Sequence, residues 1–137
     1  MKRYSGSCGC GSIEFTLNSE IKNIVNCHCQ MCRDHNGSSF STYAALPYRD
    51  LEITKGNELI GEYKLGSGIK RFCKNCGTPL LNTNEKYPGA CMIYLGTLNS
   101  ISDLIPRINI WCDNKLSWID EIVKIPCLPE SIESKSA

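Results

Sequence analysis

Seven of the ten cysteines in the chain lie in three short clusters. The clusters are an N-terminal pair (Cys8, Cys10), a triplet (Cys27, Cys29, Cys32) and a central pair (Cys73, Cys76). In a C-x-C pair on an extended backbone both side chains point to the same side, and a glycine after a C-x-C or C-x-x-C pair permits a left-handed turn. Thiolates at these spacings are typical ligands of zinc, with Zn–S distances of about 2.3 Å. The sequence therefore predicts zinc binding.

The number of clustered ligands suggests two different zinc sites. Four thiolates close a structural site, whereas three protein ligands leave a position open for water or substrate. The two pairs would form the closed site and the triplet the open one. Spacing alone leaves two alternatives: the N-terminal pair could share an ion with Cys27 and Cys29, or a lone cysteine could complete the triplet.

An open site of three thiolates favours thiol chemistry over hydrolysis. The three negative charges leave the site with a net charge near minus one, which weakens zinc as a Lewis acid and keeps a bound thiolate nucleophilic. Arg33 follows the triplet directly and is expected to offset this charge. His28 is expected to orient the site rather than bind the metal, and His35 to lie at the surface. The sequence contains no Ser/His/Asp arrangement, phosphate loop or dinucleotide fingerprint.

The other cysteines and the two tryptophans are predicted to be buried. Cys91, Cys112 and Cys127 stand alone and read as small apolar core residues. Trp111 and Trp118 are likewise expected in the core.

Length and charge indicate a single domain without a nucleic-acid partner. The 137 residues form one domain, 1–137, with a core at about 4–129 and a frayed tail at 130–137. Lys plus Arg number 15 and Asp plus Glu 14, without a basic run, which argues against nucleic-acid binding. The start of the chain lacks the apolar stretch of a secretion signal, and no segment approaches the ~20 apolar residues of a membrane span. We expect a cytoplasmic protein with reduced thiols.

The elements that position the cysteines are predicted to be mainly β. Short alternating or apolar runs end at Gly, Asn and Pro turns, and they predict strands at 13–17, 38–46, 51–54, 62–65, 69–72, 90–95 and 107–111. Helical periodicity is weak, and the best candidate is a short turn at 100–104, before Pro106.

The clusters with their flanking residues resemble the glutathione-dependent formaldehyde-activating enzyme family, which includes the centromere protein V relatives. The matching stretches are 6–11 (GSCGCG), 27–33 (CHCQMCR), 72–78 (FCKNCGT) and the closing segment at 106–118, within a match over about 4–129. The resemblance implies a zinc-containing β-tent fold of small antiparallel sheets with little helix. It also implies a structural zinc on Cys8, Cys10, Cys73 and Cys76 and a catalytic zinc on Cys27, Cys29 and Cys32. Three-ligand sites can lose metal on purification, so the second of the two ions is expected at partial occupancy.

The family's named activity is that of a carbon–sulfur lyase. It joins glutathione and formaldehyde into S-hydroxymethylglutathione and reverses that reaction, which implies glutathione or a related small thiol as partner. Relatives commonly carry a histidine where this chain has Asn109, a change expected to alter substrate handling. The alternative function is a non-catalytic zinc module that binds a protein or a thiol metabolite.

Overall fold

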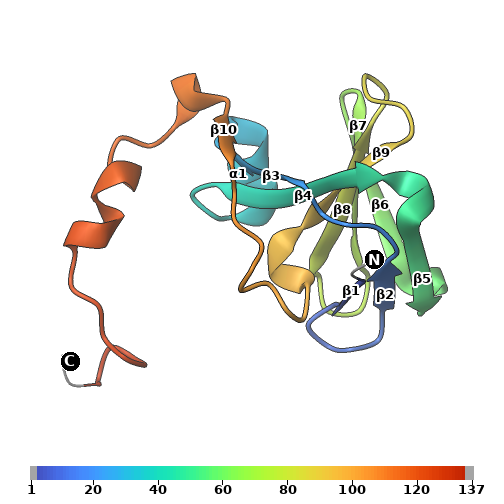
Figure 1. The fold of residues 1–137 in the computed structure, drawn as a ribbon, viewed down its shortest axis with the longest axis horizontal. Helices are drawn as coiled ribbons and strands as arrows, with labels where there is room; N and C mark the ends of the chain where they lie inside the picture. Colours follow the sequence, from blue (N-terminus) through green and yellow to red (C-terminus); the bar gives the residue numbers. More distant parts are fainter. Residues whose placement is uncertain (1–2, 135–137) are drawn as a thin grey trace.

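The computed structural model describes residues 3–134, and two β-sheets dominate it (Figure 1). The smaller sheet has the order β1 (Tyr4–Ser7), β2 (Glu14–Leu17), β5 (Leu51–Lys55). The larger sheet has the order β10 (Ile108–Ile110), β3 (Asn23–Cys27), β4 (Ser41–Pro47), β9 (Ala90–Tyr94), β8 (Pro79–Asn84), β7 (Gly68–Cys73), β6 (Ile60–Leu65). Every pairing is antiparallel except that of β10 with β3. The mainly β prediction is confirmed.

One short α-helix, α1 (Gln30–Asn36), follows β3. The Cys29 sulfur accepts a hydrogen bond from the Cys32 N–H at its start, and Gly37 ends it in the left-handed region at φ 68°. Five 3-10 segments complete the helical structure of the described chain: Tyr48–Asp50, Asn57–Leu59, Leu95–Thr97, Cys112–Asn114 and Ile119–Lys124. The segment at 100–104 forms a turn, closed by the Leu104 N–H on the Ile101 carbonyl (2.9 Å), as its sequence predicted.

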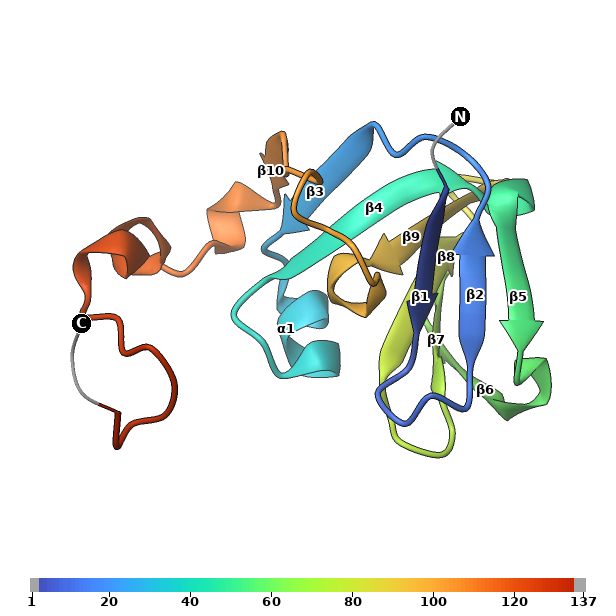
Figure 2. The same ribbon diagram turned by 60° about the horizontal axis from the view of Figure 1, so that its bottom comes forward.

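The larger sheet has two different faces because successive side chains along a strand point to opposite sides. Ala44, Ile93 and Leu81 are paired neighbours on β4, β9 and β8, and all three are buried in the main core. That core includes Phe15 and Leu17 of the smaller sheet, which lies beside the larger sheet in Figure 2. Residues adjacent in sequence to this apolar row therefore point to the other face, towards α1.

A close contact between Gly56 and the Ser12 carbonyl fixes the loop that carries the N-terminal cysteine pair. Gly56, in the turn after β5, has φ 76°, a left-handed conformation that disfavours other residues. A Cβ atom there would lie 2.1 Å from the Ser12 carbonyl oxygen, so only glycine fits. The backbone that leads from Cys10 into β2 is thereby held against β5.

The C-terminal part, from residue 111, leaves the sheets and extends to one side in both views (Figures 1 and 2). Trp111 is 64% and Trp118 49% exposed, so the prediction that they are core residues is wrong. The cause is local: β10 is an edge strand, and Trp111 directly after it has φ 60°. Cys112 and Cys127 lie in this C-terminal part and are exposed, so the prediction that they are core residues is also wrong, whereas Cys91 on β9 is fully buried as predicted.

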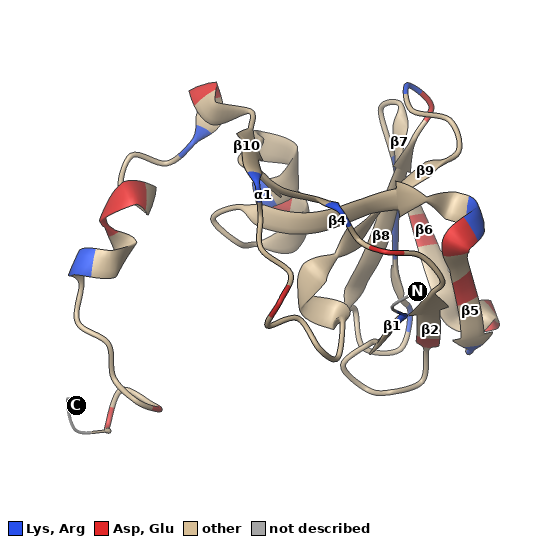
Figure 3. Cartoon of the chain, in the orientation of Figure 1, with Lys and Arg blue, Asp and Glu red and all other residues tan. Residues whose placement is uncertain are grey.

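Charged residues of both signs are interspersed along the described chain. Figure 3 shows acidic and basic positions alternating in the C-terminal part and near β5. In the described residues, none of the helices has both the length and the apolar character that crossing a membrane would require. Of the tail predicted to fray, 130–134 is mostly exposed and 135–137 lies outside the described residues.

Candidate metal centres

The first candidate centre joins the N-terminal and central cysteine pairs. The Sγ atoms of Cys8, Cys10, Cys73 and Cys76 all lie within 4.8 Å of one another. Those of Cys8 and Cys10 are 3.6 Å apart, and those of Cys10 and Cys73 are 3.9 Å apart. A tetrahedron with Zn–S bonds of about 2.3 Å separates its sulfur atoms by about 3.8 Å. The four sulfurs therefore fit one zinc ion without rearrangement, and we call this group the four-cysteine centre.

Hydrogen bonds hold the two turns of the four-cysteine centre in place. The Ile13 N–H donates to the Cys8 sulfur at 3.3 Å, and the Asn75 amide donates to the Cys10 sulfur at 3.2 Å. The Thr78 hydroxyl accepts the Gly9 N–H at 2.9 Å and so ties one turn to the other. Side-chain hydrogen bonds with Ser12 and Asn75 lower the pKa of Cys10 to about 5, which favours the thiolate form that a metal binds.

The second candidate centre is the triplet, whose three residues come from consecutive local structures. Cys27 ends β3, Cys29 caps α1 and Cys32 lies in the first turn of that helix. The Cys32 sulfur is 3.0 Å from that of Cys29 and 3.4 Å from that of Cys27. Among residues 3–134, no further Cys, His, Asp or Glu joins this group. The donor set thus suits zinc with one ligand position left for a substrate.

The triplet lies partly buried against the second face of the larger sheet. Cys27 and Cys32 are about 95% buried and Cys29 is partly exposed. Cys27 packs with Tyr43 and Tyr94, whose rings meet edge to face at 4.8 Å. The Tyr43 hydroxyl lies 3.2 Å from the Cys32 sulfur. Hydrogen bonds with Cys27 and then Tyr43 lower the pKa of Cys32 to about 5, whereas the hydrogen bond with Cys32 and burial raise that of Cys27.

Two buried polar residues, Asn82 and Lys70, lie on the same face of the larger sheet as Tyr43 and were not identified from the sequence. Asn82 on β8 and Lys70 on β7 are paired neighbours, and both are 8% exposed. The amide oxygen of Asn82 is placed towards Lys70 Nζ (3.1 Å) and the Tyr43 hydroxyl (3.2 Å), because only this orientation satisfies both. Lys70 is followed by Arg71 in a short strand, and a lysine in such a position usually faces solvent. No local signal distinguishes it.

Arg33 is hydrogen-bonded on the helix side of the triplet. Its guanidinium donates to the carbonyl oxygens of His28 (2.8 Å) and Asn114 (2.7 Å) and to the side-chain oxygen of Gln30 (2.8 Å). These bonds tie α1 to the start of the C-terminal part. Charge compensation by Arg33 stays a prediction.

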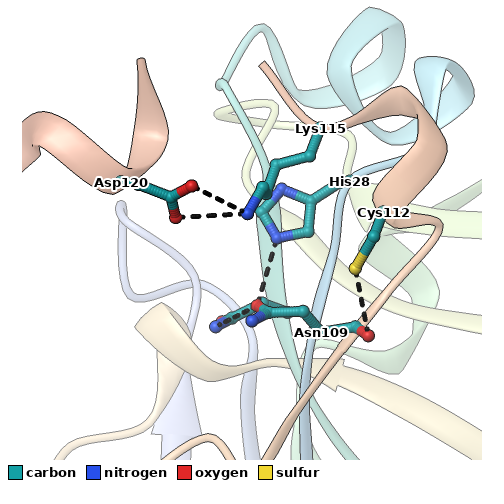
Figure 4. Close-up of polar contacts among 6 residues, drawn as sticks. His28, Asn109, Cys112, Lys115 and Asp120 are labelled. Carbon is teal, nitrogen blue, oxygen red and sulfur yellow. Dashed lines mark hydrogen bonds and ion pairs between the residues drawn. The ribbon is translucent and has the colours of Figure 1, made fainter. Parts of the chain in front are cut away.

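Asn109 contacts His28 behind β3 (Figure 4). Its side-chain oxygen lies 3.1 Å from His28 Nε2 and accepts the Asn26 amide N–H at 3.1 Å. In the β10–β3 register Asn109 pairs with Asn26, and Ile110 pairs with Cys27. Asn109 therefore faces the side of β3 opposite to Cys27, where His28 is buried against Phe40. Its contacts are those of a residue that positions the strand carrying Cys27.

The three lone cysteines give a test of metal loading. With both centres filled, a thiol-alkylating reagent is expected to modify Cys112 and Cys127 quickly, because both are exposed, and to spare fully buried Cys91. After chelation, Cys10 and Cys76 should also react, since they are exposed. Peptide mass spectrometry after timed alkylation measures this. Equal labelling of Cys10 with and without chelator would argue against metal at the four-cysteine centre.

Comparison with known proteins gives the family. The sequence model of the glutathione-dependent formaldehyde-activating enzyme family matches residues 3–114. A protein of Schizosaccharomyces pombe named an uncharacterized lyase is 35% identical over 91 residues, which are 64% of this chain and 64% of that protein. A Penicillium rubens protein whose name places it among these enzymes is 32% identical over 82 residues, 58% of this chain and 43% of that protein. This chain thus spans less than two thirds of the length of either relative.

A solved structure supports the fold. The crystal structure of a Rhodobacter sphaeroides protein superimposes with a TM-score of 0.62 at 23% identity, covering 77% of this chain and 98% of that one. Its fold and the family match over residues 3–114 agree with the architecture described above. The chain belongs to the glutathione-dependent formaldehyde-activating enzyme family.

Proposed function

We propose that the chain is a zinc-dependent carbon–sulfur lyase that acts on adducts of formaldehyde with a small thiol such as glutathione. The observation that carries this proposal is the triplet, in which three cysteine sulfurs are gathered and no fourth Cys, His, Asp or Glu of the described chain completes the set. Membership of the family and the names of its relatives support the same reaction class. The two zinc ions, one in each centre, are part of the proposal.

The triplet suits the thiol half of this reaction. A zinc ion bound there would hold a substrate thiol in its deprotonated, nucleophilic form. Cys27 and Cys32 are buried and Cys29 is partly exposed, so a ligand would approach from the side of Cys29. The Tyr43 hydroxyl contacts the Cys32 sulfur at 3.2 Å from the side of β4.

The reaction needs no oxidant or second cofactor. In the forward direction the substrate sulfur forms a bond to the carbonyl carbon of formaldehyde, and the carbonyl π electrons move to the oxygen. That oxygen takes up a proton equivalent to the one that the thiol gave up. In reverse, the hydroxymethyl group loses its hydroxyl proton, the C–S bond breaks, and the sulfur regains a proton. The protein's contribution is to hold the sulfur and orient the carbonyl.

The test is the rate of exchange between glutathione, formaldehyde and their adduct, because the uncatalysed addition is itself fast. Magnetisation-exchange NMR at equilibrium measures this rate. We expect acceleration in proportion to protein carrying two zinc ions, loss of acceleration after chelation, and recovery when zinc is restored. The metal-free protein is the matched control. Thiol binding without any acceleration would overturn the lyase proposal in favour of the non-catalytic zinc module.

A further inference from the structure

Lys70 carries a positive charge inside the sheet without an acidic partner. Its residue exposure is 8%, and within residues 3–134 it forms no ion pair with Asp or Glu. Lysines are almost never buried to this extent unless a negative group compensates them. The structure must therefore supply that negative charge from another source, and the thiolates of the triplet are such a source.

A series of close polar contacts connects Lys70 to the triplet. Lys70 Nζ lies 3.1 Å from the Asn82 amide oxygen, which lies 3.2 Å from the Tyr43 hydroxyl. That hydroxyl lies 3.2 Å from the Cys32 sulfur. The series runs from β7 through β8 and β4 to α1, and the strand register places its sheet residues on the face opposite the apolar core.

The three groups differ in what they can give to a thiolate. The ammonium group of Lys70 has three donors and no acceptor, and the amide oxygen of Asn82 only accepts. The Tyr43 hydroxyl has a single proton, which it gives either to the Asn82 oxygen or to the Cys32 sulfur, so Lys70 acts on the sulfur through its charge and not through a hydrogen-bond relay. The positive charge of Lys70 is also among the causes that lower the pKa values of Cys32 and of His35, after hydrogen bonding and burial respectively.

We propose that Lys70 is a positioning residue of the triplet, whose charge, held by Asn82 on the face of the sheet that carries Tyr43, stabilises the metal-bound thiolates. This role rests on the proposed function, in which the triplet holds zinc. Three thiolates with a divalent ion carry a net charge of minus one, and a substrate thiolate brings it to minus two. Lys70 offsets one of these charges from the buried side, so that the exposed side stays free for the substrate. Arg33 instead donates to oxygen atoms of His28, Asn114 and Gln30.

The test is the zinc affinity of the triplet in Lys70→Met, measured anaerobically against a chromophoric chelator. Methionine keeps an unbranched apolar side chain and removes the charge. The matched control is Lys64→Met on the neighbouring strand β6, an exposed lysine whose side chain is 70% accessible. We expect Lys70→Met to bind the triplet zinc about 10- to 100-fold more weakly, the range seen when groups behind metal ligands are removed. Affinity at the four-cysteine centre, and both affinities in Lys64→Met, should match the wild type.

Further variants of Lys70 distinguish an effect of its charge on zinc affinity from an effect on folding. Lys70→Arg should recover most of the lost affinity, because it restores the charge. Lys70→Gln removes the charge but keeps a donor for the Asn82 oxygen, and it should weaken the triplet in the same direction. If Lys70→Met fails to fold, as judged by loss of zinc from the four-cysteine centre, Lys70→Gln decides the question.

Two results would overturn the inference: triplet affinity equal to wild type in folded Lys70→Met, or equal affinity in Lys70→Gln when Lys70→Met does not fold. Zinc alone is the probe, so the outcome does not depend on catalysis. A wild type that binds two zinc ions without accelerating adduct exchange would overturn the proposed function and leave the role of Lys70 standing. A wild type that never binds a second zinc would overturn both.

Discussion

Replacing Cys73 with serine is expected to unfold most of the protein. Cys73 is fully buried at the end of β7, and its sulfur belongs to the centre that joins the turns of two different sheets. Metal binding at a structural zinc site contributes directly to folding, by about 10–16 kcal/mol in zinc-finger peptides. A whole domain is stable by only about 5–15 kcal/mol, so weakening this zinc site by one of its four ligands removes a large part of the net stability.

The measurement is metal content together with denaturant unfolding followed by circular dichroism. Cys127→Ser is the control, because Cys127 is exposed in the C-terminal part and should change the free energy of unfolding by less than about 0.5 kcal/mol. A Cys73→Ser protein that keeps two zinc ions and the wild-type unfolding midpoint would show that the four-cysteine centre is not a structural metal site.

Replacing Cys32 with serine is expected to abolish acceleration while leaving the protein folded. Cys32 lies on the seven-residue helix α1, whose other residues are not buried, so the main core does not depend on it. The triplet would keep two ligands and lose its zinc. The protein's contribution to adduct exchange, above the uncatalysed rate, should fall by more than about 100-fold, since even groups behind the ligands contribute 10- to 100-fold. The four-cysteine centre should keep its ion.

Exchange NMR and zinc content, measured on the same sample, check this expectation. Cys112→Ser is the matched control, since Cys112 is exposed and belongs to neither centre. Undiminished exchange in a Cys32→Ser protein with one zinc ion would remove the triplet from the proposed mechanism. Together, the Cys73 and Cys32 variants separate stability from activity.

The sequence was most informative where the relevant residues are close together in the chain. The cysteine spacing predicted the two groups that the structure assembles, although the choice between the possible partitions depended on family resemblance. Strands with clear alternation, such as β2 and β5, were also predicted within a residue or two. Helix α1 was missed because only Cys32 of its seven residues is buried, which leaves no apolar period to detect.

Features that depend on neighbouring strands could not be derived in this way. Strands β1, β3 and β8 have mixed polar composition, and pairing rather than pattern makes them strands. Lys70 and Asn82 acquire their burial only when β7 and β8 are aligned beneath Tyr43. Trp111 shows the opposite error: it was predicted to be buried because it is hydrophobic, but it follows an edge strand and is exposed.

The two centres differ in the sequence separation of their ligands, and this sets the order in which a newly made chain can acquire metal. The triplet is complete as soon as residue 32 has been synthesised, and its sulfurs need only a local turn to meet. The four-cysteine centre must wait for Cys76 and must close a loop across a separation of 63 positions, between Cys10 and Cys73. Closing that loop costs entropy of about 4 kcal/mol, so it occurs together with the docking of the sheets. The site of the proposed chemistry could therefore load zinc before folding, whereas the four-cysteine centre, which we propose to be structural, would load zinc only as folding is completed.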